Sequence, residues 1–259
     1  MLRLTIDEPV SSAAVWSRRL AVFALVVAGV SIAFARVRAG DPTAALTVFA
    51  AALIVAGFAL MLAGVAASVI WRVGFRGAGQ AFLASVLAVG LMGYPAYLTA
   101  LAFALPRIND VSTDLVSPPS FLHTARTRAA GVGAEPPQPS DATRAAQSAA
   151  YPDLQTVKVE MDVLAAYRLA LSVATDLGWR IVDLQPPSPA GGGSAAIEAI
   201  DKSLFFGFPS DVVIRVKPGA TSTAIDLRSC SRVGGHDFGA NAERIRKFVA
   251  ALKEAQVER

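Results

Sequence analysis

The sequence is poor in the residues that build disulfides, metal sites and proton pathways. It has one cysteine, Cys230, so an intrachain disulfide is excluded, and its two histidines show no H-x-x-H spacing. No Asp, Glu, Lys or His lies inside the three longest apolar runs. A transporter needs such groups within the membrane to carry protons or ions, so a transporter is not expected.

Long apolar runs fill the first part of the chain, and 54% of all residues are hydrophobic. The runs Ala44–Ile70 and Ala81–Leu105 each exceed the roughly 20 residues that a helix needs to cross a bilayer. The run Leu20–Ala35 is shorter and reaches about 20 residues if Arg18 and Arg19 snorkel to the surface. A signal peptide also has a basic flank and a short apolar core, but no small-residue cleavage site follows this run. The sequence therefore predicts three retained transmembrane helices.

The net charge of +4 comes from this apolar part alone. Residues 1–105 hold seven arginines and three acidic residues, and the rest of the chain holds 17 residues of each sign. A nucleic-acid partner is not expected, because the folded domain lacks a basic excess. The N-terminal tail and second loop carry five arginines, against three on the other side. The positive-inside rule thus predicts a multi-pass protein of the inner (cell) membrane with a cytoplasmic N-terminus and an extracytoplasmic, periplasmic C-terminal domain.

Composition divides the chain into four segments. We expect a three-helix transmembrane anchor at 1–105, a polar motif segment at 106–124, an Ala/Pro-rich linker or long loop at 125–150, and a globular domain at 151–259.

Alternating and helical patterns predict an α+β fold of order β-α-β-β-β-β-α for the domain. An antiparallel sheet is expected to carry both helices on one face, and a more curled sheet would give a helix-grip fold. The other face is expected to be exposed to water and basic, because alternate strand positions on it are charged. The predicted strands are 156–161, 179–185, 195–202, 211–217 and 223–232, and the predicted helices begin at Asp162 and Ala240.

The stretch SRVGGHDFGANAERIRKF (231–248) suggests a candidate ligand site. Arg228 and Arg232 lie four apart on one strand, and glycines and a helix start follow, which together suit an anion. The plainer interpretation is that Asp237 or Asn241 caps the helix while the arginines pair with carboxylates. With the polar motif at 108–114, the candidate ligand-binding residues are Asp110, Thr113, Asp114, Arg228, Arg232, His236, Asp237 and Asn241.

The run KSLFFGFPSD (202–211) has three phenylalanines around Gly207. A hairpin whose rings fill the core is the expected structure, since aromatic rings gain much by burial. Rings that line a pocket or dip toward a lipid surface are the alternative.

Several motifs resemble one known family, the domain-of-unknown-function family 1499. They are INDVSTD…PPSF, YPDLQTV, GWRIVD, FFGFPSDVVIRVKP and DLRSCSRVGGHDFGANAERIRKF, in that order over residues 107–259. The three apolar runs are similar to those of the membrane-anchored bacterial members. The resemblance implies no assigned activity, and family members usually have a shorter join than the 125–150 segment.

Three functions remain open. The preferred expectation is a non-catalytic, membrane-anchored envelope domain that binds an anionic lipid, a small ligand or a protein partner, without a cofactor, metal or catalytic residue. The alternative is a hydrolase-type enzyme that uses Asp110 or Asp114 with His236 or Asp237. A structural subunit of a larger membrane complex is the third.

Overall fold

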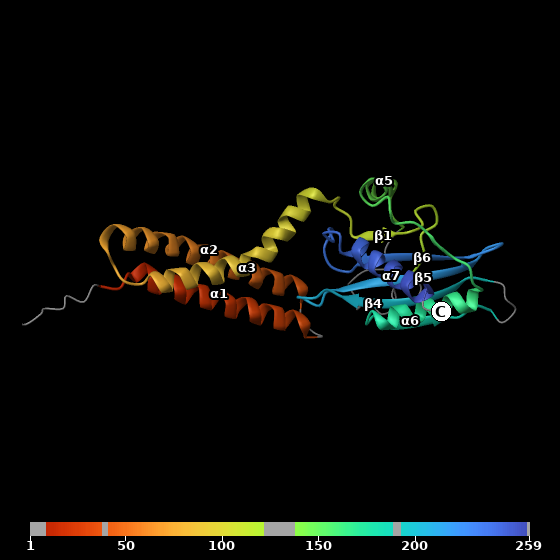
Figure 1. The fold of residues 1–259 in the computed structure, drawn as a ribbon, viewed down its shortest axis with the longest axis horizontal. Coiled ribbons are helices and arrows are strands. Elements are labelled where there is room, and N and C mark those ends of the chain that lie inside the picture. Colours follow the sequence, from red (N-terminus) through yellow and green to blue (C-terminus); the bar gives the residue numbers. More distant parts are fainter. Residues whose placement is uncertain (1–8, 38–40, 122–137, 189–192, 258–259) are drawn as a thin grey trace, which may run out of the picture. The chain divides into compact units, whose positions relative to one another are not determined.

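The structure is a computed structural model that describes residues 9–37, 41–121, 138–188 and 193–257 (Figure 1). Residues 1–100 form one compact unit and residues 101–259 form a second. The predicted linker residues 125–137 and residues 122–124 of the polar motif segment lie outside the described residues.

Three long apolar helices make up the N-terminal part: α1 (Ser12–Arg36), α2 (Pro42–Val73) and α3 (Ala78–Ala104). The side chain of Ser11 caps α1, and Asp41 caps α2, with Pro42 in the first turn where a missing N–H costs nothing. Each helix is long and apolar enough to cross a membrane. The expectation of three N-terminal apolar helices is therefore confirmed.

Small residues form the contacts among these helices, and large apolar residues point outward. Alanine accounts for most of the buried positions, so the backbones approach closely. The Ser31 hydroxyl donates a hydrogen bond to the Ala45 carbonyl across the α1–α2 contact (2.6 Å). Phe23, Ile54 and Phe82 are more than half exposed. A water-soluble bundle would bury the large residues, whereas lipid tails accept them on the outside.

The second unit is a mixed α+β domain. Its strands are β1 (Asp110–Ser112), β2 (Val157–Val159), β3 (Arg180–Gln185), β4 (Ala195–Lys202), β5 (Pro209–Pro218) and β6 (Thr223–Ser231). Its helices are α5 (Asp141–Ala150), α6 (Val163–Asp176) and α7 (Ala240–Val257).

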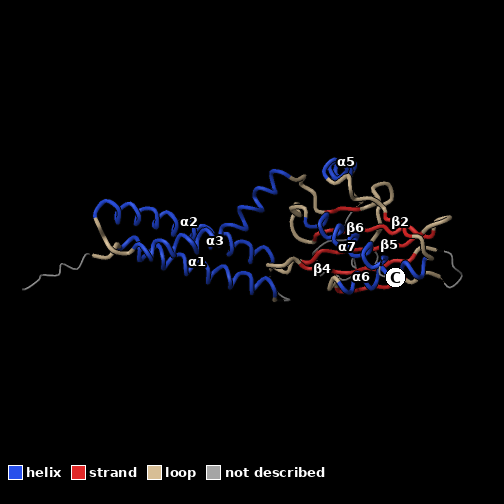
Figure 2. Tube along the Cα trace, viewed as in Figure 1, coloured by secondary structure: helices blue, strands red, loops and turns tan. Residues whose placement is uncertain are grey.

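All six strands join one antiparallel sheet (Figure 2). The order is β1-β6-β5-β4-β3, and β2 also pairs with β6. β1 pairs with the last residues of β6 and β2 with its first residues, so two short strands share one edge of β6. The sheet is open, with β3 at its far edge, and the α+β prediction is confirmed.

The core lies between one face of the sheet and helices α6 and α7. Alternate residues of β5 and β6, such as Val212, Ile214 and Leu227, point into it and are fully buried. Phe248 of α7 stacks on Trp179, with 5.5 Å between ring centroids. This burial fixes the strand register, because a one-residue slip would move every core side chain to the other face.

Two elements of the domain, strand β1 and helix α5, escaped prediction. Residues Asp141–Ala150 form helix α5, so a linker or long loop is wrong for that stretch. Its Gln147 is buried and exchanges two hydrogen bonds with the backbone of Ser112, at 2.6 and 3.1 Å. The side-chain amide thereby pairs with the backbone N–H and C=O of Ser112 on the edge of β1 that no strand of the described sheet covers.

The aromatic run forms the predicted hairpin between β4 and β5, but it does not fill the core. Leu204 is 79% exposed and Phe205 is 41% exposed at its tip. The rings of Phe206 and Phe208 stack on each other, with centroids 5.2 Å apart. The core-filling interpretation is therefore wrong for this loop.

Candidate functional site

The two polar motifs, 108–114 and 228–244, lie against each other. The Ser231 N–H and the Asn241 side-chain amide both donate to the Asn109 carbonyl, each at 2.9 Å. The Asp237 N–H donates to the Ile108 carbonyl at 3.0 Å. Residues more than 120 positions apart in the chain thus form one polar cluster along β1, β6 and the start of α7.

Arg228 is a fully buried member of this cluster, with no exposed side-chain surface. Its Nε and Nη2 atoms donate to the carboxylate of Asp110, the shortest contact being 2.6 Å. Its Nη1 donates to the Pro119 carbonyl at 3.1 Å, and its guanidinium lies 5.0 Å from the ring centroid of Phe121. Bidentate pairing and the ring together replace the water that the charge loses.

Two more arginines on the same sheet face are paired. Arg232 donates to Asp211 at 2.6 Å, and Arg215 donates to Asp226 at 2.7 Å and to Asp114 at 2.9 Å. The expectation of a basic face open to water is therefore wrong. The segment after β1 covers part of this face, and carboxylates neutralise its arginines; the expected pairing of arginines with carboxylates is confirmed.

Thr113 and Asp114 have structural partners as well. The Thr113 N–H donates to the Leu227 carbonyl, and the Leu227 N–H donates to the Thr113 hydroxyl, each at 2.9 Å. These bonds extend the β1–β6 ladder past Ser112. Asp114 accepts hydrogen bonds from the N–H groups of Val116 and Ser117 at 3.0 and 2.9 Å. This carboxylate both fixes the turn and pairs with an arginine.

Acid should weaken the domain through Asp114. Partial burial alone would raise the pKa of this carboxyl, but the two turn N–H groups and Arg215 outweigh it and hold the pKa below its usual range. A depressed pKa contributes stability above the unfolded pKa of about 4, and this contribution is lost as pH falls below that value. We expect Asp114→Asn to lower the melting temperature at pH 7, and the difference from wild type to shrink toward pH 3. A difference that stays constant over this range would contradict the assignment.

The loop before α7 is held by Asp237. Its carboxylate accepts hydrogen bonds from the N–H groups of Gly239 and Asn241, each at 2.9 Å, so the expectation that Asp237 caps the helix is confirmed. His236 accepts the Phe238 N–H at Nδ1 (3.0 Å), and the two rings stack with centroids 4.6 Å apart. Phe238 has a positive φ of 54°, which this stacking and the Asp237 bonds stabilise.

Asn241 belongs to a second buried polar cluster, on the helix side of the sheet. Its Oδ1 accepts from Ser229 at 2.8 Å and from Arg244 at 2.6 Å, and Arg244 also donates to Asp201 at 2.6 Å. Sequence reasoning missed Ser229, Arg244 and Asp201 as partners. The spacing of Asn241 and Arg244, three apart on one helix face, was the available signal.

This arrangement suits stability better than catalysis. Asp110, Asp114 and Asp237 are each occupied by an arginine or by backbone N–H groups. Among the described residues, no group of three or more His, Cys, Asp or Glu side chains is placed to hold a metal ion. Ligand binding by the eight candidate residues stays a prediction.

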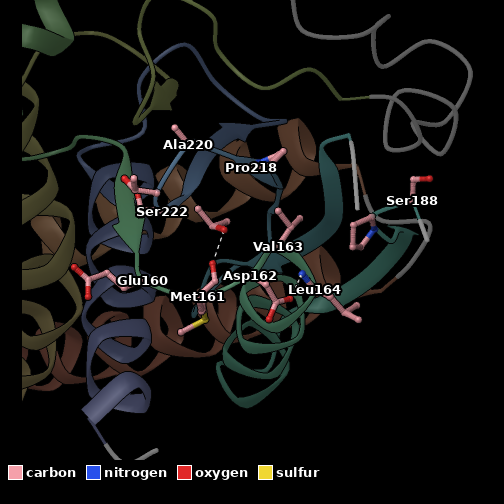
Figure 3. Close-up of a pocket in the computed structure, with 13 residues that line it drawn as sticks. Glu160, Met161, Asp162, Val163, Leu164, Ser188, Pro218, Ala220 and Ser222 are labelled. Atoms are coloured by element: carbon pink, nitrogen blue, oxygen red, sulfur yellow. Dashed lines mark hydrogen bonds between the residues drawn. The ribbon is translucent and has the colours of Figure 1, made fainter. Parts of the chain in front are cut away.

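A cavity of about 650 Å³ lies at the other end of the sheet (Figure 3). It is bounded by the turn between β5 and β6, the segment between β2 and α6, and the residues after β3. The Thr223 hydroxyl donates to the Met161 carbonyl at 2.6 Å and joins two of these walls. Asp162 accepts the N–H groups of Leu164 and Ala165, at 2.9 and 3.0 Å, as the predicted cap of α6.

The lining of the cavity combines carboxylates, hydroxyls and apolar groups. It comprises Glu160, Met161, Asp162, Val163, Leu164, Pro187, Ser188, Pro218, Gly219, Ala220, Thr221, Ser222 and Thr223. Sequence reasoning did not find this cavity, because three separate loops form it and only register shows that they meet.

Residues 110–252 match the model of a family described as protein of unknown function (DUF1499). No curated protein matches the chain.

Proposed function

Because the chain belongs to the DUF1499 family of proteins of unknown function, its role has to come from its own geometry, and we propose a non-catalytic binding domain on a membrane anchor. The observation that carries this proposal is the cavity of about 650 Å³ in a domain that follows directly on three apolar helices. Its volume falls within the roughly 300–1,000 Å³ typical of small-molecule sites.

Helix length and surface support the anchor. The helices have 25, 32 and 27 residues. At about 1.5 Å per residue, each is longer than the roughly 30 Å of a hydrocarbon core. Many of their exposed side chains are large and apolar, as lipid contact requires. We assign the protein to the inner (cell) membrane as a multi-pass protein, with its N-terminus in the cytoplasm and its domain on the extracytoplasmic side.

The native cysteine content makes this orientation directly testable. Cys230 is buried, so it contributes little background to thiol labelling. Glu254 is exposed on α7, and we expect Glu254→Cys to react with a membrane-impermeant maleimide in intact cells. Wild-type protein is the control, and lysed cells give the maximum signal. Labelling of Glu254→Cys only after lysis would place the domain in the cytoplasm.

The chemistry of the cavity favours a small polar ligand that is neutral or cationic. Its lining residues include the acidic Glu160 and Asp162 beside residues with hydroxyl groups, and no Lys or Arg is among the lining residues that the structure describes. An anionic ligand at Arg228 and Arg232 would have to displace the carboxylates of Asp110 and Asp211. Breaking a buried pair of this kind costs several kcal/mol, so the cavity is the better supported binding site.

Filling the cavity tests this proposal. Ala220 is exposed on the turn that bounds the cavity, and Ala220→Trp should occupy its mouth without disturbing the core. We expect members of a panel of small polar metabolites and amines to raise the melting temperature of the full-length wild type in detergent, but not that of Ala220→Trp.

The matched control is Lys253→Trp, at an exposed position of α7, which should respond as the wild type does. Equal responses of Ala220→Trp and wild type, or no response of the wild type to any compound, would count against the cavity as a binding site.

A further inference from the structure

The start of α1 and the segment between α2 and α3 are joined at one end of the helical unit. The Ser11 N–H donates to the Arg76 carbonyl at 2.9 Å, and the Arg76 N–H donates to the Pro9 carbonyl at 3.1 Å. Gly77 follows with a positive φ of 126°, and a Cβ added there would lie 3.0 Å from the Ala14 Cβ. Backbone contacts therefore hold this end of the unit together, with little room for a side chain.

Four exposed arginines belong to this end. Arg18 and Arg19 lie in the second turn of α1, Arg72 lies in the last turn of α2, and Arg76 lies in the joined segment. Within the described ranges, none of the four pairs with a carboxylate. A guanidinium group that is exposed and has no carboxylate beside it is available to an anion from outside the protein.

The sequence offers few acidic residues to neutralise this end. Over residues 1–20 and 71–80 it has five arginines and two acidic residues, Asp7 and Glu8, which leaves a net charge of +3. In the described part of the helical unit Asp41 is the one acidic residue, and it caps α2 at the other end of that helix. The positive charge is thus concentrated where α1 starts and α2 ends.

Two tryptophans accompany the arginines. Trp16 is 54% exposed and Trp71 is 91% exposed. The guanidinium of Arg19 lies 5.3 Å from the ring centroid of Trp16, so the ring supports this charge on the surface of α1. Tryptophan is enriched at the boundary between head groups and acyl chains. Given the proposed membrane anchor, the two rings place this end of the unit at the level of the lipid head groups.

The surface next to the arginines is apolar and suits acyl chains. Phe23 and Val26 follow Arg19 along α1, and each is more than half exposed. Side chains of a helix lean toward its N-terminus, so Arg18 and Arg19 point away from this apolar run and toward the head groups. A lipid contacts the charged and the apolar surface at once, whereas a free phosphate ion contacts only the charged one.

We infer that this end of the helical unit binds the phosphates of anionic phospholipids, such as phosphatidylglycerol, in preference to zwitterionic ones. Arginine donates two parallel N–H bonds to a phosphate group. An anionic lipid brings an uncompensated negative charge to the arginines, whereas phosphatidylcholine carries its own ammonium group beside the phosphate. The inference rests on the proposed membrane anchor, and the site is separate from the cavity of the domain.

The native tryptophans report which lipid occupies the site. Trp71→Phe leaves Trp16 as the reporter, because Trp179 is only 7% exposed in the core of the domain. The full-length variant is reconstituted in vesicles of equal parts phosphatidylcholine and phosphatidylglycerol, with quenching bromine atoms on the acyl chains of one lipid or the other. We expect quenching to show a preference of about five-fold for phosphatidylglycerol, the factor that one arginine near an anionic surface contributes.

Paired variants in the Trp71→Phe background make the result specific. Arg18→Gln with Arg19→Gln should lower the preference below about two-fold, since both charges beside the reporter are lost. Arg18→Lys with Arg19→Lys should retain most of it, because lysine keeps the charge. The matched control, Arg168→Gln with Arg180→Gln, removes two exposed arginines of the domain and should leave the preference unchanged.

Equal quenching by the two lipids before any arginine is changed, or a preference that survives Arg18→Gln with Arg19→Gln, overturns the inference. An equal loss in the Arg168→Gln and Arg180→Gln control also overturns it, since the effect would then follow net charge alone. Displacement of the lipid by inorganic phosphate at matched ionic strength would assign the site to a free anion instead.

Vesicles of brominated phosphatidylcholine alone separate these failures from that of the anchor. Quenching of Trp16 in these vesicles, without a preference in the mixed ones, contradicts the head-group site and leaves the anchor standing. Absence of quenching in these vesicles contradicts the anchor and the inference together.

Discussion

Asp110→Asn should destabilise the domain more than any other single loss of charge on this sheet face. The substitution leaves Arg228, whose side chain has no exposed surface, without its counter-charge. Removing one partner of a buried ion pair costs about 3–5 kcal/mol, because the remaining charge is desolvated and uncompensated. For a domain of this size each kcal/mol lowers the melting temperature by about 2–4 °C, so we expect a fall of about 10 °C for the full-length protein in detergent.

Two further variants make the result specific. The pair Asp153–Arg246 has the same chemistry but is exposed, with 52% and 38% of its side chains accessible, so Asp153→Asn should cost less than about 1 kcal/mol. Replacing both buried partners, Asp110→Leu with Arg228→Met, should be milder than Asp110→Asn alone, since no charge is left behind. If Asp110→Asn is as harmless as Asp153→Asn, the buried pair has no structural role.

Phe248→Ala should remove a comparable amount of stability from the opposite face of the sheet. The ring is fully buried and stacks on Trp179, and α7 contributes it to the centre of the core. Truncation of a buried Phe to Ala costs about 3–5 kcal/mol, as lost transfer free energy and as a cavity. The measurement is again the thermal midpoint of the full-length protein in detergent.

The control for this prediction lies on the same helix. Val257 is 88% exposed, so Val257→Ala should leave the midpoint within about 2 °C of the wild type, as is usual for surface positions. Phe248→Leu should lie between the two, because it retains most of the buried volume. Equal midpoints for Phe248→Ala and Val257→Ala would mean that α7 does not pack as described.

The main elements of the domain could be predicted because each has a local signal. Asp162 caps α6 as expected, and Gly178 follows that helix with a positive φ of 76°. The alternation Val212, Ile214, Val216 placed β5 correctly in the core. In these cases the residues near one another in sequence determine both the local backbone conformation and which side chains are buried.

The missed elements depend on distant partners. β1 is three residues long and has no pattern of its own; its partner is β6, more than 100 positions later. Helix α5 did have a local signal, since Ser140 caps an alanine-rich stretch with good helix propensity, but its few large apolar residues suggested a linker. Its role depends on the buried Gln147 that binds β1.

The candidate site was predicted in position but not in environment. The sequence correctly placed Arg228, Arg232 and Asp226 on one face of a strand. Whether water reaches that face depends on which other segments cover it. Residues such as Pro119 and Phe121, more than 100 positions away from β6 in the chain, cover part of it by contacting Arg228. Strand alternation assigns a side chain to a face, and only tertiary contacts decide whether water reaches it.

The position of β6 near the end of the chain determines when the domain can fold during synthesis. β1 is synthesised just after the last apolar helix, but its hydrogen-bonding partners in β6 and the guanidinium for Asp110 emerge 118 residues later. Long-range pairing of this kind delays folding, so the nascent domain stays incomplete until nearly all of it has been translated. A chain that stops before Thr223 would leave β1, β2 and β5 all without their shared neighbour, and quality-control proteases should then degrade it.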